Sequence, residues 1–313
     1  MEAGNDVELL GHRPERGVRL VVPVGRSIII VGDGQVRVSG GSVTPCVPSS
    51  LEVLKQLAES LTGRKPILLV GPADSGKSTL ASYIYNTGLS DVIASLDVGQ
   101  NEVYCPGFAA VSSPIRPSVP GSARGPARAC FVGDFTPRGL EARFLYCALR
   151  LLRGVGRAVI DTDGWIEGEG LVLKAAVAEA IDAVVVAIGL GDEARRVMAS
   201  YIGDIVAFGR FAPRTKSQAE RRTNRDRLIA SCLSGSRRRP ISAELLTERP
   251  PKGGLEDLLA SAFGQGEDHF AIIERASERS RTLTLLTSYE GRIDAVRLGR
   301  AKIDLSNFSG LMA

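Results

Sequence analysis

The middle of the chain alternates short apolar runs with longer segments in which apolar positions recur at helical spacing. The apolar runs lie at Ile67–Val70, Val92–Leu96, Ala158–Ile160, Ala183–Ile188 and Ile205–Phe208. The helical pattern occurs around residues 77–87, 139–153, 171–180, 192–201 and 217–232. Continuous apolar strands that alternate with helices are typical of a parallel sheet covered by helices on both faces. The pattern therefore predicts an α/β domain.

Both ends of the chain have a different pattern. Short β-type runs lie at Arg19–Pro23, Ser27–Val31 and Gln35–Ser39, and they predict a small β module over residues 1–48. A helix is predicted to follow, because Ser49 and Ser50 precede leucines at helical spacing.

The C-terminal runs, Phe270–Ile273, Thr282–Leu286 and Ala295–Leu298, alternate like strands. We therefore expect three parts: the β module, an α/β domain over residues 49–240, and a β domain over residues 241–313. Residues 104–128 are rich in Pro, Gly and Ser, and a loop of that length is usually functional or disordered.

Composition narrows the class of protein. Of the 313 residues, 44% are hydrophobic and 24% charged, as in globular proteins with a sizeable core. The longest apolar runs fall far short of the ~20 residues that a membrane span needs. The N-terminus lacks a basic-then-apolar signal segment, so we expect no membrane and a cytoplasmic protein, or a nuclear one if the source is eukaryotic.

Cysteine spacing argues against metal or disulfide frameworks. The five cysteines are too far apart in sequence for a zinc-type pair, and only two histidines are present. We therefore expect buried free thiols.

One segment resembles a phosphate-binding loop. Gly71-Pro72-Ala73-Asp74-Ser75-Gly76-Lys77-Ser78 follows an apolar strand and opens a helix, which is the context that this motif requires. Backbone N–H groups and the helix N-terminus would hold the phosphates of a nucleoside triphosphate. Lys77 would reach the β- and γ-phosphates, Ser78 would bind Mg²⁺, and Thr79 would contact the α-phosphate.

Two carboxylates follow predicted strands, at the edge where open α/β sheets bind ligands. Asp97 could accept a proton from an attacking hydroxyl or hold Mg²⁺ through water, or simply cap a turn. Asp161 also follows an apolar run, and pattern alone does not decide which aspartate is the Walker B residue.

The turn after Asp161 contains Trp165, the one tryptophan in the chain. An exposed indole there could stack on a nucleobase, whereas a packing role is the alternative.

Net charge is only +4, but arginines cluster over Arg210–Arg239. Arg221 and Arg225 are four apart, and therefore share a face of the predicted helix. Such a segment could close over the nucleotide and neutralise charge on the γ-phosphate; a solvated charged face is the alternative.

Taken in order, these motifs resemble the polynucleotide 5′-hydroxyl kinase family, which includes the kinase subunit of the pre-mRNA cleavage machinery, the pre-ribosomal RNA-processing kinase and smaller archaeal relatives. The resemblance covers roughly residues 65–235. It rests on the motifs Gly71–Thr79, Leu96–Gln100, Gly133–Pro137, Thr162–Trp165 with Gly168 and Gly170, and Arg221–Asp226.

The resemblance implies a P-loop fold and transfer of the ATP γ-phosphate to the 5′-hydroxyl end of RNA, or of DNA. Asp97 would be the base and, with Ser78, a Mg²⁺ ligand. Lys77, Arg221 and Arg225 would stabilise charge. Residues implied to hold ATP are Gly71, Asp74, Ser75, Gly76, Lys77, Ser78 and Thr79.

The acceptor would be bound by Gln100, Thr136, Thr162, Gly164, Trp165 and Arg222. Ser95 departs from the family pattern, since that position is often acidic, and activity could be weaker for it. Two other functions stay open: an ATP-binding scaffold without turnover, and a P-loop kinase or NTPase that acts on a small molecule.

Overall fold

The structure is a computed structural model. It describes the chain except for residues 1, 4–6, 16, 23–27, 44–51, 53, 57–59, 62–64, 121–127, 204, 211–214, 278 and 312–313. The end of the expected β module, residues 44–48, and the start of the helix expected after it thus lie outside the described residues, as does Cys46. Leu54 and Leu61 of that helix are described, and both are buried.

By packing, the chain divides into two compact units. The first comprises Met1–Ser95, Val111–Arg124 and Leu152–Lys216, and the second comprises Leu96–Ala110, Gly125–Leu151 and Ser217–Ala313. The division of the chain into the three parts expected from the sequence stays a prediction.

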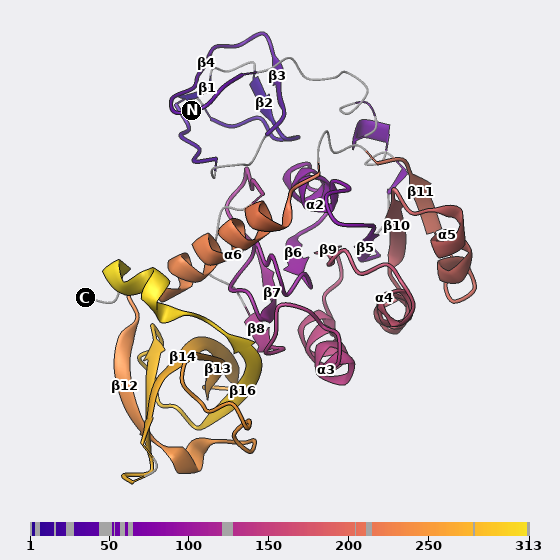
Figure 1. Ribbon diagram of the computed structural model, residues 1–313. Coiled ribbons are helices and arrows are strands. Elements are labelled where there is room, and N and C mark those ends of the chain that lie inside the picture. The colour runs from indigo at the N-terminus through magenta and orange to yellow at the C-terminus, as the bar shows by residue number, and fades with distance from the viewer. Residues whose placement is uncertain are drawn as a thin grey trace. The chain divides into compact units, whose positions relative to one another are not determined.

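A seven-stranded sheet has the order β11-β10-β5-β9-β6-β7-β8 (Figure 1). Five of its strands pair in parallel, as continuous apolar strands require. These are β5 (Ile67–Val70), β6 (Val92–Ser95), β9 (Ala158–Asp161), β10 (Val184–Ile188) and β11 (Ile205–Phe208). Every residue of β5 and β9 is buried, which explains their lack of polar alternation.

The helices lie close to where helical spacing predicts them. They are α2 (Lys77–Asn86), α3 (Glu141–Leu152), α4 (Glu169–Ala180), α5 (Asp192–Ala199) and α6 (Gln218–Leu233). Ser217 caps α6, because its hydroxyl accepts from the Glu220 amide at 3.2 Å while the Glu220 carboxylate accepts from the Ser217 amide at 2.8 Å. The predicted α/β fold with a parallel sheet is confirmed. None of the described helices has the length and apolarity to cross a bilayer.

The stretch 104–128 is not one long loop, so that prediction is wrong. It contains β7 (Phe108–Ser112), all five residues of which are buried, and β8 (Arg128–Phe131) begins at its end. β7 has only two bulky apolar side chains among five residues, and its run is too short to stand out among the surrounding prolines and glycines.

The N-terminal segment forms two short antiparallel pairs. β1 (Glu2–Ala3) pairs with β4 (Val36–Arg37), and β2 (Val7–Leu9) pairs with β3 (Ile30–Gly32). The buried Asn86 side chain, at the end of α2, donates to the Leu10 carbonyl at 3.0 Å. The N-terminal segment is therefore tied to the helix that starts at the phosphate-binding loop.

The C-terminal sheet has five antiparallel strands in the order β12-β15-β14-β13-β16. They are β12 (Arg237–Ser242), β13 (Leu258–Gly264), β14 (Glu267–Ser277), β15 (Thr282–Thr287) and β16 (Ala295–Lys302). The chain also contains the 3₁₀ helices η1 (Ala243–Leu245) and η2 (Leu305–Leu311). The C-terminal β-sheet is as expected, although β12 and β13 were not foreseen, because the first is arginine-rich and the second does not alternate.

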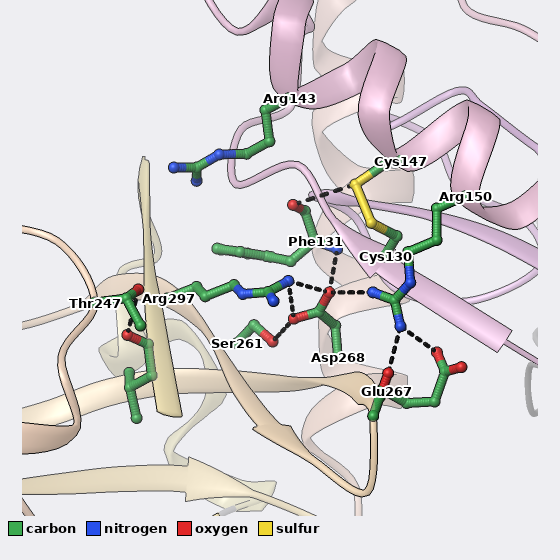
Figure 2. Close-up of polar contacts among 12 residues, drawn as sticks. Cys130, Phe131, Arg143, Cys147, Arg150, Thr247, Ser261, Glu267, Asp268 and Arg297 are labelled. Atoms are coloured by element: carbon green, nitrogen blue, oxygen red, sulfur yellow. Dashed lines mark hydrogen bonds and ion pairs between the residues drawn. A yellow bond between two sulfur atoms is a disulfide. The ribbon is translucent and has the colours of Figure 1, made fainter. Parts of the chain in front are cut away.

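A buried carboxylate, Asp268, joins this sheet to β8 (Figure 2). It accepts from the Phe131 amide at 3.1 Å, the Ser261 hydroxyl at 2.7 Å and the Arg297 guanidinium at 2.9 Å. Arg150 of α3 lies 3.6 Å from it. A buried charge with this many donors is compensated, so the contact fixes the C-terminal sheet within the second unit.

Four of the five cysteines form disulfides, Cys105–Cys232 and Cys130–Cys147, so the prediction of free thiols is wrong for these. Cys105 and Cys232 are 127 residues apart, yet their Cα atoms lie 6.0 Å apart. Only the folded chain brings such residues together, and sequence spacing carried no sign of it. Figure 2 shows the second disulfide, between β8 and α3.

Candidate functional site

The phosphate-binding loop has the backbone that its glycines require. Gly76 has a φ of 108°, and Asp74 has a φ of 57°, a left-handed conformation that is uncommon for a residue with a side chain. A Cβ at Gly71 would lie 2.3 Å from the Ile188 carbonyl oxygen of β10, so no larger residue fits there. The loop then enters α2 with its amides at the helix N-terminus, which is a site for anions.

Lys77 is held inside the loop. Its ammonium donates to the carbonyl oxygens of Gly71 and Pro72, both at 2.8 Å, and the residue is buried. These two hydrogen bonds hold the Lys77 ammonium against the backbone of the loop that would surround the phosphates. A phosphate would offer the ammonium a charged acceptor, which makes a stronger hydrogen bond than a neutral carbonyl.

Asp161 lies beside the predicted Mg²⁺ ligand. The Ser78 hydroxyl donates to Asp161 Oδ2 at 2.7 Å, because β5 and β9 are neighbours and Asp161 is opposite Leu69 in their register. Pattern alone left Asp97 and Asp161 open as the Walker B residue. Asp161 makes this hydroxyl–carboxylate contact with Ser78, and its role as the Walker B residue stays a prediction.

The donor set at Ser78 and Asp161 fits Mg²⁺. This ion takes oxygen ligands and keeps several waters, so it needs one or two protein groups beside the phosphates. Among the described residues there is no cluster of three His, Cys, Asp or Glu side chains that would form a separate metal cage. The Gly71 cradle, the curled Lys77 and this oxygen pair together suit a magnesium–nucleotide complex.

The turn after β9 packs against the loop. A Cβ on Gly164 would lie 2.5 Å from the Ala73 amide nitrogen, so the two backbones are in direct contact. The buried Thr162 hydroxyl donates to the Leu69 carbonyl at 2.7 Å. Thr162 thus ties the strand tips together, and its contact with an acceptor stays a prediction.

A buried lysine that sequence reasoning missed supports the same turn. Lys174 of α4 donates to Asp163 Oδ1 at 2.6 Å and to the Trp165 carbonyl at 2.7 Å. Lysine on a helix usually marks an exposed face, and only the fold reveals that this one is 2% exposed. Trp165 itself is half-buried.

The loop also contacts the segment that leads into α6. Asp74 Oδ2 accepts from the Lys216 amide at 3.0 Å, just before the Ser217 cap. Arg214, another basic residue of this segment, lies outside the described residues.

In the second unit, Asp97 begins a tight turn. Its Oδ1 accepts from the amides of Gly99, at 3.0 Å, and Gln100, at 2.9 Å, so the carboxylate is held in one orientation. A Cβ on Gly99 would lie 2.6 Å from the Phe135 carbonyl oxygen, which explains the glycine. Asp97 is half-buried. The turn-capping alternative is therefore realised in part, and the roles of Asp97 as base and as Mg²⁺ ligand stay predictions.

Gln100 contacts helix α6. Its Nε2 donates to the Arg221 carbonyl at 2.9 Å, and its Oε1 accepts from the side-chain Nδ2 of Asn224. The Arg225 guanidinium lies 4.6 Å from the centre of the Phe135 ring, in cation–π contact. The structure thus gathers Asp97, Gln100 and α6, and Asn224 is a partner that sequence reasoning missed.

Two other predicted acceptor residues are on this unit's surface. Arg222 is exposed on α6, and its charge helps to lower the pKa of Asp304, after the larger effect of hydrogen bonds from Ser306. Thr136 is half-buried, and its hydroxyl accepts from the Arg138 amide at 3.3 Å. Ser95 pairs with Asp161 in the β6–β9 register of the first unit, and its buried hydroxyl makes no hydrogen bond with the described residues.

The family model described as the mRNA cleavage and polyadenylation factor CLP1 P-loop matches residues 71–229, half of the chain. The chain belongs to the CLP1 P-loop family. The matched stretch begins at Gly71 and ends within α6, so it includes every predicted site residue.

Curated relatives carry a kinase name. A polyribonucleotide 5′-hydroxyl kinase from Pyrococcus furiosus is 29% identical over 153 residues, which is 46% of this chain and 43% of that protein. Polyribonucleotide 5′-hydroxyl-kinase Clp1 from Homo sapiens is 30% identical over 159 residues, 44% of this chain and 37% of that protein. The chain therefore matches less than half the length of these relatives.

Solved structures of CLP1 proteins share the fold beyond the matched stretch. The wild-type Clp1p–Pcf11p complex contains a chain that superposes with a TM-score of 0.70 at 13% identity, covering 96% of this chain and 94% of that one. A second Clp1p–Pcf11p structure, which concerns ATP loss in a point mutant, gives a TM-score of 0.69. At this identity the likeness establishes the architecture alone.

Proposed function

We propose that the chain is an ATP-dependent kinase that phosphorylates the 5′-hydroxyl end of a polynucleotide, either RNA or DNA. The observation that carries this proposal is the Ser78–Asp161 contact beside the curled Lys77, in a member of the CLP1 P-loop family. A phosphate-binding loop alone does not specify the phosphate acceptor. The choice of a 5′-hydroxyl end as the acceptor therefore rests on the relatives that are named 5′-hydroxyl kinases.

Nucleotide binding falls to the loop and α2. Backbone N–H groups from Ala73 to Gly76 and the α2 N-terminus would surround the phosphates, with Thr79 near the α-phosphate. Lys77 would exchange its two carbonyl acceptors for phosphate oxygens. Ser78 would hold Mg²⁺, oriented by Asp161, and the ion when bound would neutralise charge on the β- and γ-phosphates.

Deprotonation of the acceptor falls to Asp97. Two backbone amides fix Oδ1, and an oriented carboxylate can accept the proton of a 5′-hydroxyl as that oxygen attacks phosphorus. The new bond joins the hydroxyl oxygen to the γ-phosphorus, and the bond to the β–γ bridging oxygen breaks. Arg221 and Arg225 would stabilise the charge that spreads over the transferred group.

The predicted acceptor residues Gln100, Thr136, Thr162, Gly164, Trp165 and Arg222 would bind the terminal nucleotide. Support differs among them: Trp165 is partly accessible and Arg222 is exposed, whereas Gln100 and Thr162 already hydrogen-bond to the protein backbone. Trp165 and Arg222 would therefore contact the terminal nucleotide directly, whereas Gln100 and Thr162 would position the groups around it.

The test is a labelling assay with a 5′-hydroxyl oligonucleotide and γ-labelled ATP. We expect the wild type to label RNA, and Lys77→Ala and Asp97→Asn to lose about 10²- to 10³-fold, as when one charge-stabilising group is removed. A 5′-phosphorylated oligonucleotide is the matched substrate control. Equal labelling by wild type and both variants would overturn the proposal.

A scaffold without turnover is the second candidate, because Clp1p of the same fold was solved in complex with a protein, Pcf11p. ATP that copurifies and is never consumed would favour it. A small-molecule kinase is distinguished by salt: affinity for a nucleic acid falls steeply with ionic strength when several phosphates are contacted.

A further inference from the structure

Lys174 is the most deeply buried cation among the described residues, with 2% of its surface exposed. A buried ammonium is stable only when paired and hydrogen-bonded. Its acceptors are Asp163 Oδ1 at 2.6 Å, the Trp165 carbonyl at 2.7 Å and the Gly170 carbonyl at 3.5 Å. An ammonium has three donors, so this set uses the whole capacity of the group.

Two of the three acceptors belong to the turn that follows β9. Asp163 Oδ1 also accepts from the Trp165 amide at 3.0 Å, so Lys174 and Asp163 together hold both backbone polar groups of Trp165. A tryptophan in a glycine-rich turn would otherwise have considerable backbone freedom. The Lys174–Asp163 ion pair therefore fixes the backbone of Trp165.

The indole is fixed as well. A Cβ on Gly170 would lie 2.6 Å from the ring atoms Cδ2 and Cγ of Trp165, so the ring lies directly on the backbone of α4. The contact of Gly164 with the Ala73 amide sets the whole turn against the phosphate-binding loop. The position of the indole is thus defined relative to the loop through backbone contacts.

Stability alone is a weak reason for such a pair. Well-packed apolar residues in place of a buried ion pair are often neutral or stabilising, and in some proteins buried ionic groups are retained for the specific arrangement that they enforce. Here it orients a partly accessible aromatic ring, and rings of this kind bind single-stranded nucleic acid by stacking on bases.

We propose that Lys174 is a positioning residue which, through Asp163 and the Trp165 carbonyl, holds the indole for stacking on the terminal base of a 5′-hydroxyl nucleic acid. The inference rests on the proposed function for the identity of that ligand. It assigns no chemistry to Lys174.

The chain's one tryptophan makes the test direct, because intrinsic fluorescence reports on Trp165 alone. The full chain is titrated with a 5′-hydroxyl RNA oligonucleotide and with the same oligonucleotide whose 5′-terminal residue is abasic. We expect quenching by the first and about tenfold weaker binding of the second, the size of one lost base–aromatic stack. Equal quenching by both oligonucleotides, or by neither, would overturn the inference.

Variants separate positioning from mere structure. Lys174→Met leaves Asp163 buried and unpaired and should unfold at a lower temperature, whereas adding Asp163→Asn removes the stranded charge and restores much of that loss. We expect both variants to show at least about twofold greater acrylamide quenching of Trp165. We also expect about tenfold weaker oligonucleotide binding, with ATP affinity within about twofold of wild type. Lys65→Met, which breaks an exposed ion pair with Asp182, is the matched control.

A double variant with wild-type quenching and wild-type oligonucleotide binding would refute the positioning role. These readouts need no turnover. Binding and quenching as expected, with no phosphate transfer by the wild type, would therefore sink the proposed kinase function and leave the positioning role in place.

Discussion

At the scale of single residues, two aspartates that look alike in sequence have different surroundings. Asp161 accepts from Ser78, while Asp97 accepts from the amides of its own turn. We therefore propose that Asp161 orients the Mg²⁺ ligand Ser78 and that Asp97 accepts the proton of the substrate hydroxyl.

Substitution to asparagine should separate these roles. Asp161→Asn is expected to raise the Mg²⁺ concentration for half-maximal labelling by about 10- to 100-fold, as loss of a residue that orients a metal ligand does. Asp97→Asn should lower kcat, and an unchanged Mg²⁺ requirement would show that Asp97 is a base and not a Mg²⁺ ligand. Initial rates over a Mg²⁺ series check both. Identical magnesium curves for Asp161→Asn and the wild type would contradict the assignment.

Gly164 offers a second residue-scale prediction. An alanine there would place its Cβ 2.5 Å from the Ala73 amide nitrogen, so the turn or the loop must shift, at a cost of about 1–3 kcal/mol. We expect Gly164→Ala to weaken ATP binding and lower the unfolding temperature. Gly156→Ala is the matched control, because a Cβ at that position would meet no atom within 4 Å. Titration calorimetry measures ATP affinity, and scanning calorimetry measures the unfolding temperature of both variants. An ATP affinity of Gly164→Ala equal to that of Gly156→Ala would count against a role for the contact between the turn and the loop.

Residue-level prediction from sequence succeeded where one motif contained the whole signal. Gly71 to Ser78 adjoin in sequence, and spacing alone placed them at the strand–helix junction. Lys174 and Asn224 escaped notice because their partners, Asp163 and Gln100, are 11 and 124 residues away. A polar residue on a helix is ordinary in sequence, and its burial depends on tertiary packing.

At the scale of elements, α6 is held at several points along its length. Gln100 contacts its first turns, Phe135 lies under Arg225, and Cys232 near its end is linked to Cys105. The Asp97 turn and the arginine helix therefore form one connected element within the second unit. Helical spacing predicted α6 but not this attachment.

Loosening that attachment should slow catalysis more than it weakens folding. Gln100→Ala removes both hydrogen bonds to α6, and a displacement of charge-stabilising groups by ~1 Å can cost about 10²-fold in rate. We expect kcat to fall about 10- to 100-fold with little change in unfolding temperature. Gln218→Ala, at an exposed position of the same helix, is the control. A wild-type kcat for Gln100→Ala would show that the attachment has no catalytic consequence.

The C-terminal sheet should have an acid-sensitive contact. Burial lowers the pKa of His269, which stacks on Tyr289 at 3.8 Å, although a backbone hydrogen bond with Gly264 and the charges of Asp268 and Glu267 act in the opposite direction. The folded state thus binds this proton less readily than the unfolded chain. Its contribution to stability is complete above pH ~6.5 and is lost as pH falls from there through the lowered value.

We expect the unfolding temperature to decline below pH ~6.5 in the wild type and less steeply in His269→Phe, which keeps the aromatic stack and cannot titrate. Thermal unfolding between about pH 5 and pH 8 measures this. Parallel curves for the two proteins would show that His269 does not contribute.

At the scale of the whole molecule, the fold class followed from periodicity because strand and helix spacing repeat many times along the chain. β7 and β13 were missed for a local reason: small residues such as Ala109, Ala110 and Ala262 give a weak apolar signal although all are buried. The disulfides were missed because their pairing depends on the tertiary fold. Cys105 and Cys232 are 127 residues apart in sequence and come together only when the chain between them is folded.

Those disulfides should each contribute measurably to the stability of the folded chain. In the chain-entropy account, closing a loop of 127 residues is worth about 5 kcal/mol and one of 17 residues about 3 kcal/mol. We expect Cys232→Ser to lower the unfolding temperature more than Cys147→Ser does, and a reductant to lower that of the wild type but not further that of a variant that lacks both bonds.

Counting thiols tests the same prediction without mutation. Protein purified without reductant and then denatured should expose one reactive thiol, because four of the five cysteines are paired. Five thiols and no effect of reductant would contradict it. Disulfides persist in oxidising compartments and in intracellular proteins of hyperthermophiles, and are rare in other cytosols. One thiol from protein isolated under native redox conditions would therefore also restrict where such a chain can work.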